Sequence, residues 1–263
     1  MTDPRILIIV PTLGTRLALL DQCLGSIAGQ QVPVTIVVVA PEGKPGLADL
    51  ISRHGAVLAP DPGSLAGAIN VGAATAQAHH EFVNWIGDDD LLEPGSLLAT
   101  VAALDADPAA VLSYGACRYI DEVGSELWVS RAGKWAPRIL KWGPDLIPQP
   151  GMLVRRSAWD AVGGLDESFR FAFDLDLLLK IQPLGRFIDV NRIVSSFRWH
   201  GDSLTVGDRT TSLRESEIAR RRALSPLARR LAWSWEGPVR VATRAAAAEL
   251  HRRAARRQAG GKP

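Results

Sequence analysis

The stretch Phe82-Val83-Asn84-Trp85-Ile86-Gly87-Asp88-Asp89-Asp90-Leu91-Leu92-Glu93-Pro94 decides the fold of this chain. Its apolar first part predicts a buried strand, and Pro94 suits the first turn of a following helix. Three carboxylates therefore follow the carboxyl end of a strand, which is where open α/β sheets have their ligand crevice. Taken alone, such a triplet is also typical of a solvated turn that caps the next helix.

The acidic triplet has a chemical interpretation of its own. Adjacent carboxylates repel one another, and a hard divalent ion such as Mg²⁺ or Mn²⁺, bridging to substrate phosphate, relieves that repulsion. Side chains two residues apart in an extended segment point the same way, so we expect Asp88 and Asp90 to hold the ion. Asp89 is expected to face the opposite way, toward a ribose or a sugar.

Strands and helices alternate around this stretch. The patterns predict strands at 6–10, 34–39, 56–58 and 81–86, with helices at 16–28, 45–53, 64–79 and 94–106. Such alternation is typical of a parallel sheet with right-handed crossovers. Further along, they predict strands at 110–118, 152–154, 187–190 and 193–199, helices beginning near 157 and 174, and an antiparallel ribbon over 119–130. The fold class is therefore α/β, with a Rossmann-like, mostly parallel central sheet flanked by helices.

Composition excludes several classes of protein. Of the 263 residues, 47% are hydrophobic and 22% are charged, which is ordinary for a globular chain. No apolar run reaches the roughly 18–20 residues that span a bilayer. Cys23 and Cys117 lie far apart in apolar stretches, which favours buried, reduced thiols. We expect a cytoplasmic protein, with peripheral contact to the inner face of the cell membrane as an option.

Charge is distributed unevenly along the chain. Residues 214–263 carry 13 basic and 4 acidic side chains, a net +9, whereas residues 1–213 carry 17 and 24, a net −7. Arginines interleaved with Trp233 and Trp235 suit an interfacial helix against anionic lipid. A solvated helical extension that packs on the body, or a contact between copies in a homo-oligomer, explains them equally well. No motif supports binding of nucleic acid.

Several short motifs occur in an order that resembles one enzyme family. They are Val10-Pro11-Thr12 with Arg16 nearby, Ala66–Gly72, Trp85–Pro94, Arg155-Arg156-Ser157, Gly163-Gly164-Leu165-Asp166-Glu167, Phe173-Asp174-Leu175-Asp176-Leu177 and Arg198–Thr205. Over residues 5–206 this order resembles the inverting family-2 glycosyltransferases, which have the GT-A fold. The resemblance implies a GT-A domain at 1–206, divided near residue 110 into a nucleotide-sugar-binding half and an acceptor-binding half. Residues 207–263 would form a basic helical extension.

The resemblance also implies roles for individual residues. Asp174 would be the general base, which takes the proton of an acceptor hydroxyl, although an Asp at a helix start is often only an N-cap. Arg198 would contact phosphate or be structural. The expected donor contacts are Pro11, Thr12, Arg16, Glu42, Asn70, Asp88 and Asp89; the expected metal ligands are Asp88, Asp90 and His200; and the expected acceptor contacts are Asp176, Arg155 and Trp199.

The chain departs from the family pattern after its second strand. The family has Asp-Asp-Gly-Ser there, with an Asp that contacts the nucleotide base, whereas this chain has Ala40-Pro41-Glu42-Gly43. Glu42 either replaces that Asp or is a turn residue. The family's aspartate run also often begins one residue earlier, at the position of Gly87, so which two aspartates hold the metal stays open.

These observations together predict a metal-dependent inverting transferase. It would move a sugar from a nucleotide-diphosphate donor, UDP or dTDP rather than GDP, to a glycan, a lipid-linked saccharide or a small molecule. The alternatives are a degenerate binding or scaffold protein and a sugar nucleotidyltransferase. The latter would need a loop richer in Gly and basic residues than Pro11–Arg16. A dinucleotide oxidoreductase is disfavoured because no G-x-G-x-x-G follows the first strand.

Overall fold

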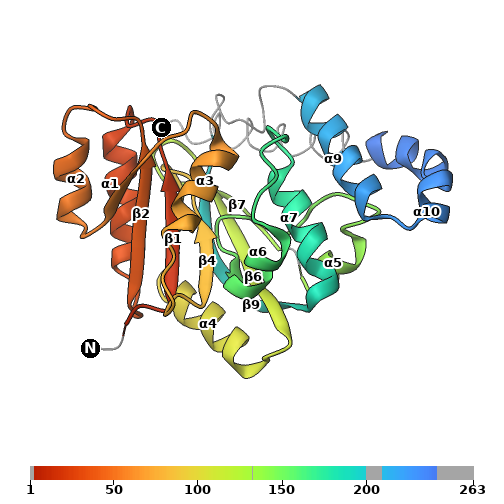
Figure 1. The fold of residues 1–263 in the computed structure, drawn as a ribbon, viewed down its shortest axis with the longest axis horizontal. Coiled ribbons are helices and arrows are strands. Elements are labelled where there is room, and N and C mark those ends of the chain that lie inside the picture. Colours follow the sequence, from red (N-terminus) through yellow and green to blue (C-terminus); the bar gives the residue numbers. More distant parts are fainter. Residues whose placement is uncertain (1–2, 132, 200–208, 242–263) are drawn as a thin grey trace.

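A mixed sheet forms the centre of the molecule (Figure 1). The computed structural model describes residues 3–131, 133–199 and 209–241, and within them the strand order is β3-β2-β1-β4-β8-β6-β9-β5, with β7 paired to β6. The strands are β1 (Ile6–Pro11), β2 (Val34–Ala40), β3 (Val57–Pro60), β4 (Phe82–Trp85), β5 (Leu91–Leu92), β6 (Ala110–Ile120), β7 (Glu126–Ser130), β8 (Leu153–Arg155) and β9 (Arg186–Arg198).

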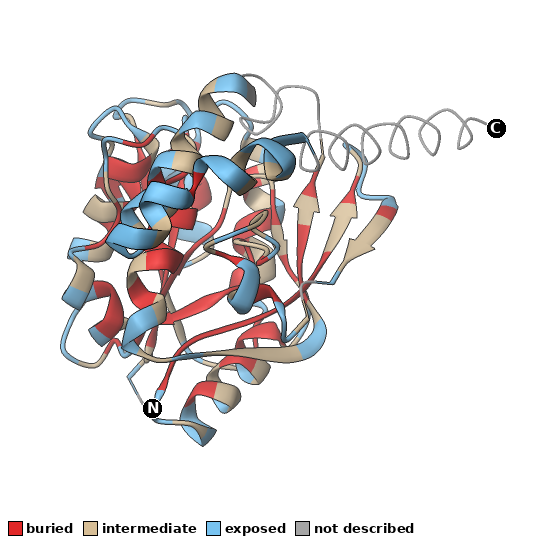
Figure 2. Ribbon diagram, turned by 90° about the vertical axis from the view of Figure 1, so that its right-hand side faces the viewer, coloured by how far each residue is buried: buried red, intermediate tan, exposed pale blue. Residues whose placement is uncertain are grey.

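Helices cover both faces of this sheet, and a separate apolar core lies under each set. Helices α1 (Leu17–Ala28), α2 (Leu47–Arg53) and α4 (Ser96–Ala106) contribute to one core. The other core takes residues from α3 (Leu65–Ala74), α5 (Ala136–Ile139), α6 (Arg156–Val162), α7 (Phe173–Ile181) and α9 (Arg209–Ala223). Figure 2 shows buried residues in the strands and exposed residues on the outer helix faces. The α/β fold class predicted from the sequence is confirmed.

The first half of the sheet is parallel, as the alternation of elements predicts. Strands β3, β2, β1 and β4 all run the same way, so their carboxyl ends meet at one edge. Every residue of β1 is buried, which explains its continuous apolar sequence. Helix α3 packs closely on this strand, because a Cβ atom on Gly72 would lie 2.5 Å from the Ile9 side chain.

The second half is irregular. Strand β8 pairs antiparallel with both β4 and β6, and β6 forms the expected antiparallel ribbon with β7. The prediction of two strands at 187–190 and 193–199 is wrong, because β9 runs unbroken from Arg186 to Arg198 beside β6. Asn191 has a φ of 51° within it, and the pairing with β6 changes register nearby. Residues 191–192, which separated the two predicted strands, lie at this irregularity.

The described part of the C-terminal extension packs on the body. It consists of α9 and α10 (Pro226–Leu231), preceded in the chain by the short helix η1 (Gln182–Leu184) and β9. Ala219 of α9 is 1% exposed and belongs to the core that contains α7. Within the described residues no helix has the length and apolarity needed to cross a bilayer. The boundary expected at 206/207 stays a prediction.

Candidate active site

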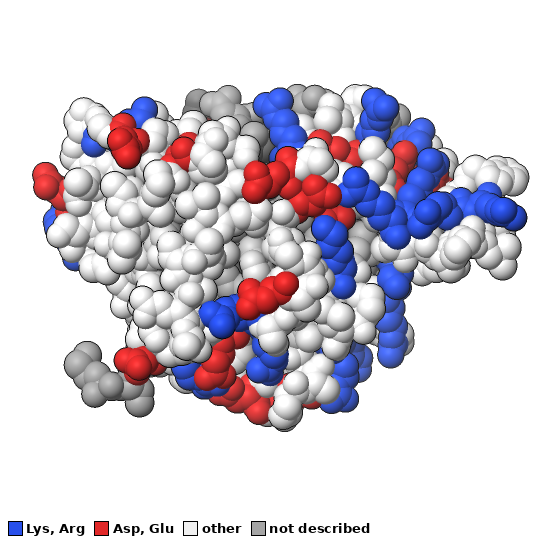
Figure 3. Space-filling view, in the orientation of Figure 1, with Lys and Arg blue, Asp and Glu red and all other residues white. Residues whose placement is uncertain are grey.

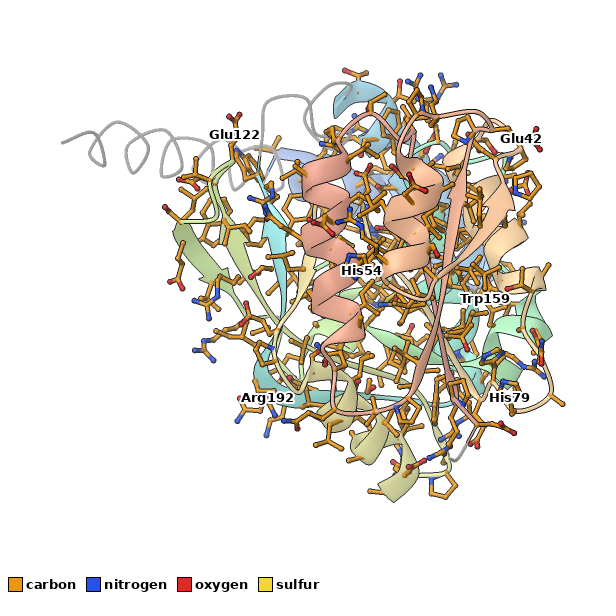
Figure 4. All side chains as sticks on the ribbon, turned by 90° about the vertical axis from the view of Figure 1, so that its left-hand side faces the viewer. Glu42, His54, His79, Glu122, Trp159 and Arg192 are labelled. Carbon is orange, nitrogen blue, oxygen red and sulfur yellow. The ribbon has the colours of Figure 1, made fainter. Side chains whose placement is uncertain are left out.

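The acidic triplet lies where the parallel strands end. The Thr12 N–H donates to the Val39 carbonyl at 2.9 Å, and the Ile86 N–H donates to the Ile9 carbonyl at 2.9 Å, which holds the three strand ends together. Figure 4 shows Glu42 and Glu122 at this end of the molecule and His79 at the opposite end.

Asp88 and Asp89 share one arginine. The Arg16 guanidinium donates to Asp88 Oδ1 at 2.5 Å and to Asp89 Oδ2 at 2.7 Å, and the Thr12 hydroxyl donates to Asp88 Oδ2. Burial raises the pKa of Asp88, although Thr12 and Arg16 oppose that rise. The prediction that Asp89 faces away from Asp88 is wrong. Residues 87–90 form a turn, with the Asp90 N–H donating to the Gly87 carbonyl at 3.1 Å, so strand alternation does not apply.

Asp90 points into the protein, where Arg198 surrounds it. The Asp90 carboxylate is 4% exposed and accepts the Arg198 N–H at 2.9 Å. Burial, followed by the charge of Asp89, raises the pKa of Asp90 well above its usual range. The Arg198 side chain donates to the carbonyl oxygens of Asp89, Asp121 and Glu122 and to Gln22. Arg198 is therefore structural.

The triplet offers only oxygen ligands. Among the residues that the structure describes, no three His, Cys, Asp or Glu side chains are grouped to hold a metal ion. His200, the third expected ligand, lies outside the described residues. Carboxylates of Asp88 and Asp90 suit a hard cation such as Mg²⁺ or Mn²⁺, which commonly completes its shell with phosphate oxygens and water. The donor chemistry fits an ion that protein and diphosphate hold jointly.

Three other expected donor contacts have different positions. Pro11 is buried at the end of β1, and Glu42 is exposed in the turn after β2, both at the edge that carries the triplet. Asn70 does not join them. Its side chain donates to the Leu165 carbonyl at 2.9 Å and accepts the Leu165 N–H at 3.0 Å, so its amide ties α3 to the turn after α6.

Asp174 lies in the first turn of α7. Its carboxylate accepts the Leu175 N–H at 2.7 Å, and burial raises its pKa to about 6. The N-cap position belongs to Ala172, so the alternative interpretation of Asp174 as an N-cap is wrong. A carboxyl group that titrates near neutrality inside a protein is typical of general bases.

Asp145 is a second carboxyl group near Asp174, and the sequence analysis missed it. Burial and then the charge of Asp174 raise its pKa to about 7, while the Ile147 N–H and the charge of Arg220 oppose the rise. Its Oδ1 atom accepts the Ile147 N–H at 2.9 Å. The only sequence signal was an acid within the proline-containing loop at 134–150.

Asp176 is buried, and Arg155 lines a surface hollow with His80 and Glu81 at the end of the sheet away from the triplet. Asp176 is 2% exposed, with its carboxylate 2.6 Å from Lys180 Nζ and 3.9 Å from Arg222 Nη1, so it is an internal ion-pair partner. Arg155 pairs with Phe82 at the start of β4, the end of the strand away from the triplet, and donates to the Ala110 and Leu104 carbonyls. Neither arrangement supports an acceptor contact.

Trp199 belongs to an aromatic group at the carboxyl ends of β6 and β9. Its N–H donates to the Ile120 carbonyl at 2.8 Å, and its ring meets that of Trp128 edge-on at 5.5 Å. Tyr119 stacks on Trp128 at 4.4 Å. Burial, with charges that include Asp90 and Asp145, raises the pKa of Tyr119, which places this aromatic group beside the acids of both halves.

Comparison with known proteins identifies the architecture. No protein-family model matches the chain. The O-antigen biosynthesis protein RfbC of Myxococcus xanthus is 29% identical over 192 residues, a match that covers 68% of this chain and 14% of that protein. The structure of S. aureus TarS 1-349 in complex with UDP-GlcNAc superposes with a TM-score of 0.62 at 15% identity, covering 84% of this chain and 70% of that one. This chain has the GT-A fold.

A second solved structure covers more of the chain. The mannosyltransferase PcManGT from Pyrobaculum calidifontis, in complex with GDP-Man and Mn²⁺, matches with a TM-score of 0.60 at 19% identity, covering 95% of this chain and 76% of that one. The match to RfbC, by contrast, spans about a seventh of the length of that protein.

Proposed function

We propose that this GT-A chain is an inverting glycosyltransferase that uses Mn²⁺ or Mg²⁺ and a nucleotide-diphosphate sugar. The observation that carries the proposal is the pair Asp88 and Asp90 directly after β4, with Asp174 on the neighbouring helix α7. Phe173, the residue before Asp174, has its ring 6.3 Å from that of Trp85 at the end of β4, and burial raises the pKa of Asp174 to about 6. The acceptor would be a hydroxyl of a glycan, a lipid-linked saccharide or a small molecule. The match to an O-antigen biosynthesis protein supports the saccharide classes.

On the donor side, Thr12 and Arg16 hold Asp88 in position before any ligand binds. Asp88 and Asp90 would hold the metal ion, which when bound neutralises charge on the leaving diphosphate. Arg16 would then be free to contact phosphate or Asp89. We expect UDP or dTDP rather than GDP, as the sequence motifs suggest; the two solved structures hold UDP-GlcNAc and GDP-Man and do not separate these donors. Pro11 and Glu42 remain proposed contacts of the nucleotide.

On the acceptor side, Asp174 would act as the general base. As the acceptor oxygen bonds to the anomeric carbon, its proton passes to the Asp174 carboxylate and the bond to the diphosphate breaks. Attack from the side opposite the leaving group inverts the anomeric centre. A pKa of about 6 keeps Asp174 ionised at neutral pH yet basic enough to accept the proton. Trp199 and its aromatic neighbours would contact the acceptor sugar.

A panel of nucleotide sugars tests the proposal. Binding by titration calorimetry, with and without Mn²⁺, identifies the donor, and transfer to saccharide acceptors identifies the reaction. A protein that binds a donor but transfers to no acceptor, with Asp174→Asn indistinguishable from wild type, would support the alternative of a degenerate binding protein. Release of diphosphate from a nucleoside triphosphate and a sugar phosphate would instead support the nucleotidyltransferase alternative.

For the extension, the described residues favour packing on the body over an interfacial helix. Arg221 pairs with Glu236 and Arg240 pairs with Glu217 inside the extension. The Trp235 ring meets that of Trp142 in the body at 5.1 Å, and Arg222 pairs with Asp166 of the body. Figure 3 nevertheless shows basic side chains gathered over α9 and α10. Trp233 is 74% exposed there, so a weak peripheral contact with anionic lipid stays a proposal.

A further inference from the structure

Helix α7, which carries Asp174, has no side-chain hydrogen bond from the residue at its N-cap position. The residue at its N-cap position is Ala172, and no side chain of that residue can accept a bond from the first turn. The backbone N–H groups that lead into a helix need acceptors, and a buried helix start without them is destabilised. In this chain Phe173 stands immediately before Asp174, so the preceding side chain offers no acceptor either.

Glu215 of α9 supplies the missing acceptors. Its Oε1 accepts the Arg170 N–H at 3.1 Å, and its Oε2 accepts the Phe171 N–H at 2.7 Å and the Ala172 N–H at 3.1 Å. One carboxylate thus binds three successive backbone groups at the entry to α7. A negative charge at a helix N-terminus is also favoured by the helix dipole.

Neighbouring contacts hold α9 in place for this role. Ala219, one turn after Glu215, is 1% exposed in the core that contains α7. Arg222 Nη1 lies 2.7 Å from Asp166 Oδ2, in the segment that joins α6 to α7. The guanidinium of Arg222 also lies 4.7 Å from the centre of the Phe169 ring. Helix α9 therefore clamps the connection that leads into α7 at several points.

We infer that Glu215 is a positioning residue for Asp174: α9 fixes the first turn of α7 and thereby the place of the proposed base. The inference rests on the proposed role of Asp174. It assigns part of the active-site architecture to the extension, which the sequence analysis set apart from the transferase domain. Asp174 is the second residue of α7, so a shift of that turn displaces its carboxylate.

The test is a double-mutant cycle on the full-length chain. Glu215→Gln keeps the size of the side chain but replaces one oxygen with an amide that cannot accept, so one edge of the cap is lost. We expect transfer to fall roughly 10–100-fold, because displacement of a reacting group by about 1 Å has an effect of that size. Affinity for the nucleotide should stay at the wild-type value.

The decisive measurement is Glu215→Gln in the Asp174→Asn background. If Glu215 acts through Asp174, it should reduce the residual rate little further. An equal fold-loss in both backgrounds would overturn the inference, as would wild-type transfer by Glu215→Gln alone. A normal transfer rate for Asp174→Asn would refute the proposed base rather than the role of Glu215. In that case, faster amide hydrogen exchange at residues 170–172 in Glu215→Gln would still show that Glu215 binds these N–H groups.

Glu217→Gln provides the matched control. Glu217 lies on the same helix and binds Arg240 at 2.7 Å, so the substitution makes the same charge change without touching α7. We expect its transfer rate and exchange at 170–172 to match wild type. A loss as large as that of Glu215→Gln would show a general effect of α9 and overturn the inference. If Glu215→Gln folds poorly, Glu215→Asp, which keeps both oxygens on a shorter arm, replaces it.

Discussion

The carboxylates of the two halves, which we propose bind the donor and the acceptor, have different hydrogen-bond partners. After β4, Asp88 and Asp89 share the Arg16 guanidinium, and Asp90 accepts a backbone bond from Arg198. On the other side, Asp174 accepts the Leu175 N–H in a setting where burial dominates its pKa. Burial raises the pKa of carboxyl groups in both halves, Asp88 and Asp90 as well as Asp174, so the difference lies in the partners of these groups. In the first half a guanidinium bridges two carboxylates, whereas Asp174 accepts a backbone N–H and faces a second carboxyl group, Asp145.

The largest expected effect is a loss of transfer without a loss of donor binding. Asp174→Asn keeps the shape of the side chain but cannot take a proton, so transfer should fall roughly 10²–10⁴-fold. Donor affinity and the melting temperature should stay near wild type. Steady-state transfer and nucleotide titration measure the two halves separately, and near-normal transfer would move the base elsewhere.

The second-largest expected effect is a loss of Mn²⁺-dependent nucleotide binding. Asp88→Asn should weaken Mn²⁺-dependent nucleotide binding by at least roughly 10–100-fold, since it removes a charged oxygen ligand. Binding in the absence of metal should change less. Asp61→Asn, at a half-buried position after β3, is the control for an acid near the same edge. Equal nucleotide affinity of Asp88→Asn and wild type in Mn²⁺ would remove Asp88 from the metal site.

A third prediction concerns Asp145 and the pH dependence of the free energy of unfolding. Its folded-state pKa, about 7, exceeds the ordinary value of 3.8, so its protonated form favours folding, and that contribution is lost as pH rises from about 4 through 7. Asp145→Asn removes the ionised group and should raise the free energy of unfolding at pH 8 by on the order of 1–2 kcal/mol. Urea unfolding at pH 4 should show no such gain. A variant less stable than wild type at pH 8 would contradict the assignment of a costly buried charge.

The smallest effect concerns the extension. Trp233→Ser should reduce pelleting with anionic vesicles at low salt a few-fold and leave donor binding unchanged, because Trp233 is 74% exposed. Trp235→Ser, which removes the contact with Trp142, should instead lower the melting temperature. If wild-type protein ignores such vesicles, the peripheral contact is absent.

The two halves also differ in how far sequence predicts them. Continuous apolar runs defined β1, β2 and β4, and the triplet followed directly because it adjoins β4 in the chain. The predicted orientation of Asp89 is wrong because Asp89 lies in a turn, and strand periodicity does not predict side-chain directions in a turn. Asp145 and Glu215 were missed because each acts on α7 from a distant segment, and no local pattern reports such contacts.

The cap on α7 sets an order for folding during synthesis. Glu215 follows the groups it binds by 43 to 45 residues. The parallel pairs β1–β2, β1–β4 and β2–β3 lie within the first 85 residues, so the parallel half of the sheet can form while the rest is still being made. Helix α7 leaves the ribosome before Glu215 of α9, which accepts the N–H groups of residues 170–172. We expect the parallel half of the sheet to form first, the acidic triplet to gain its contacts with Arg198 later, and the proposed base to reach its final place only after residue 215 has left the ribosome.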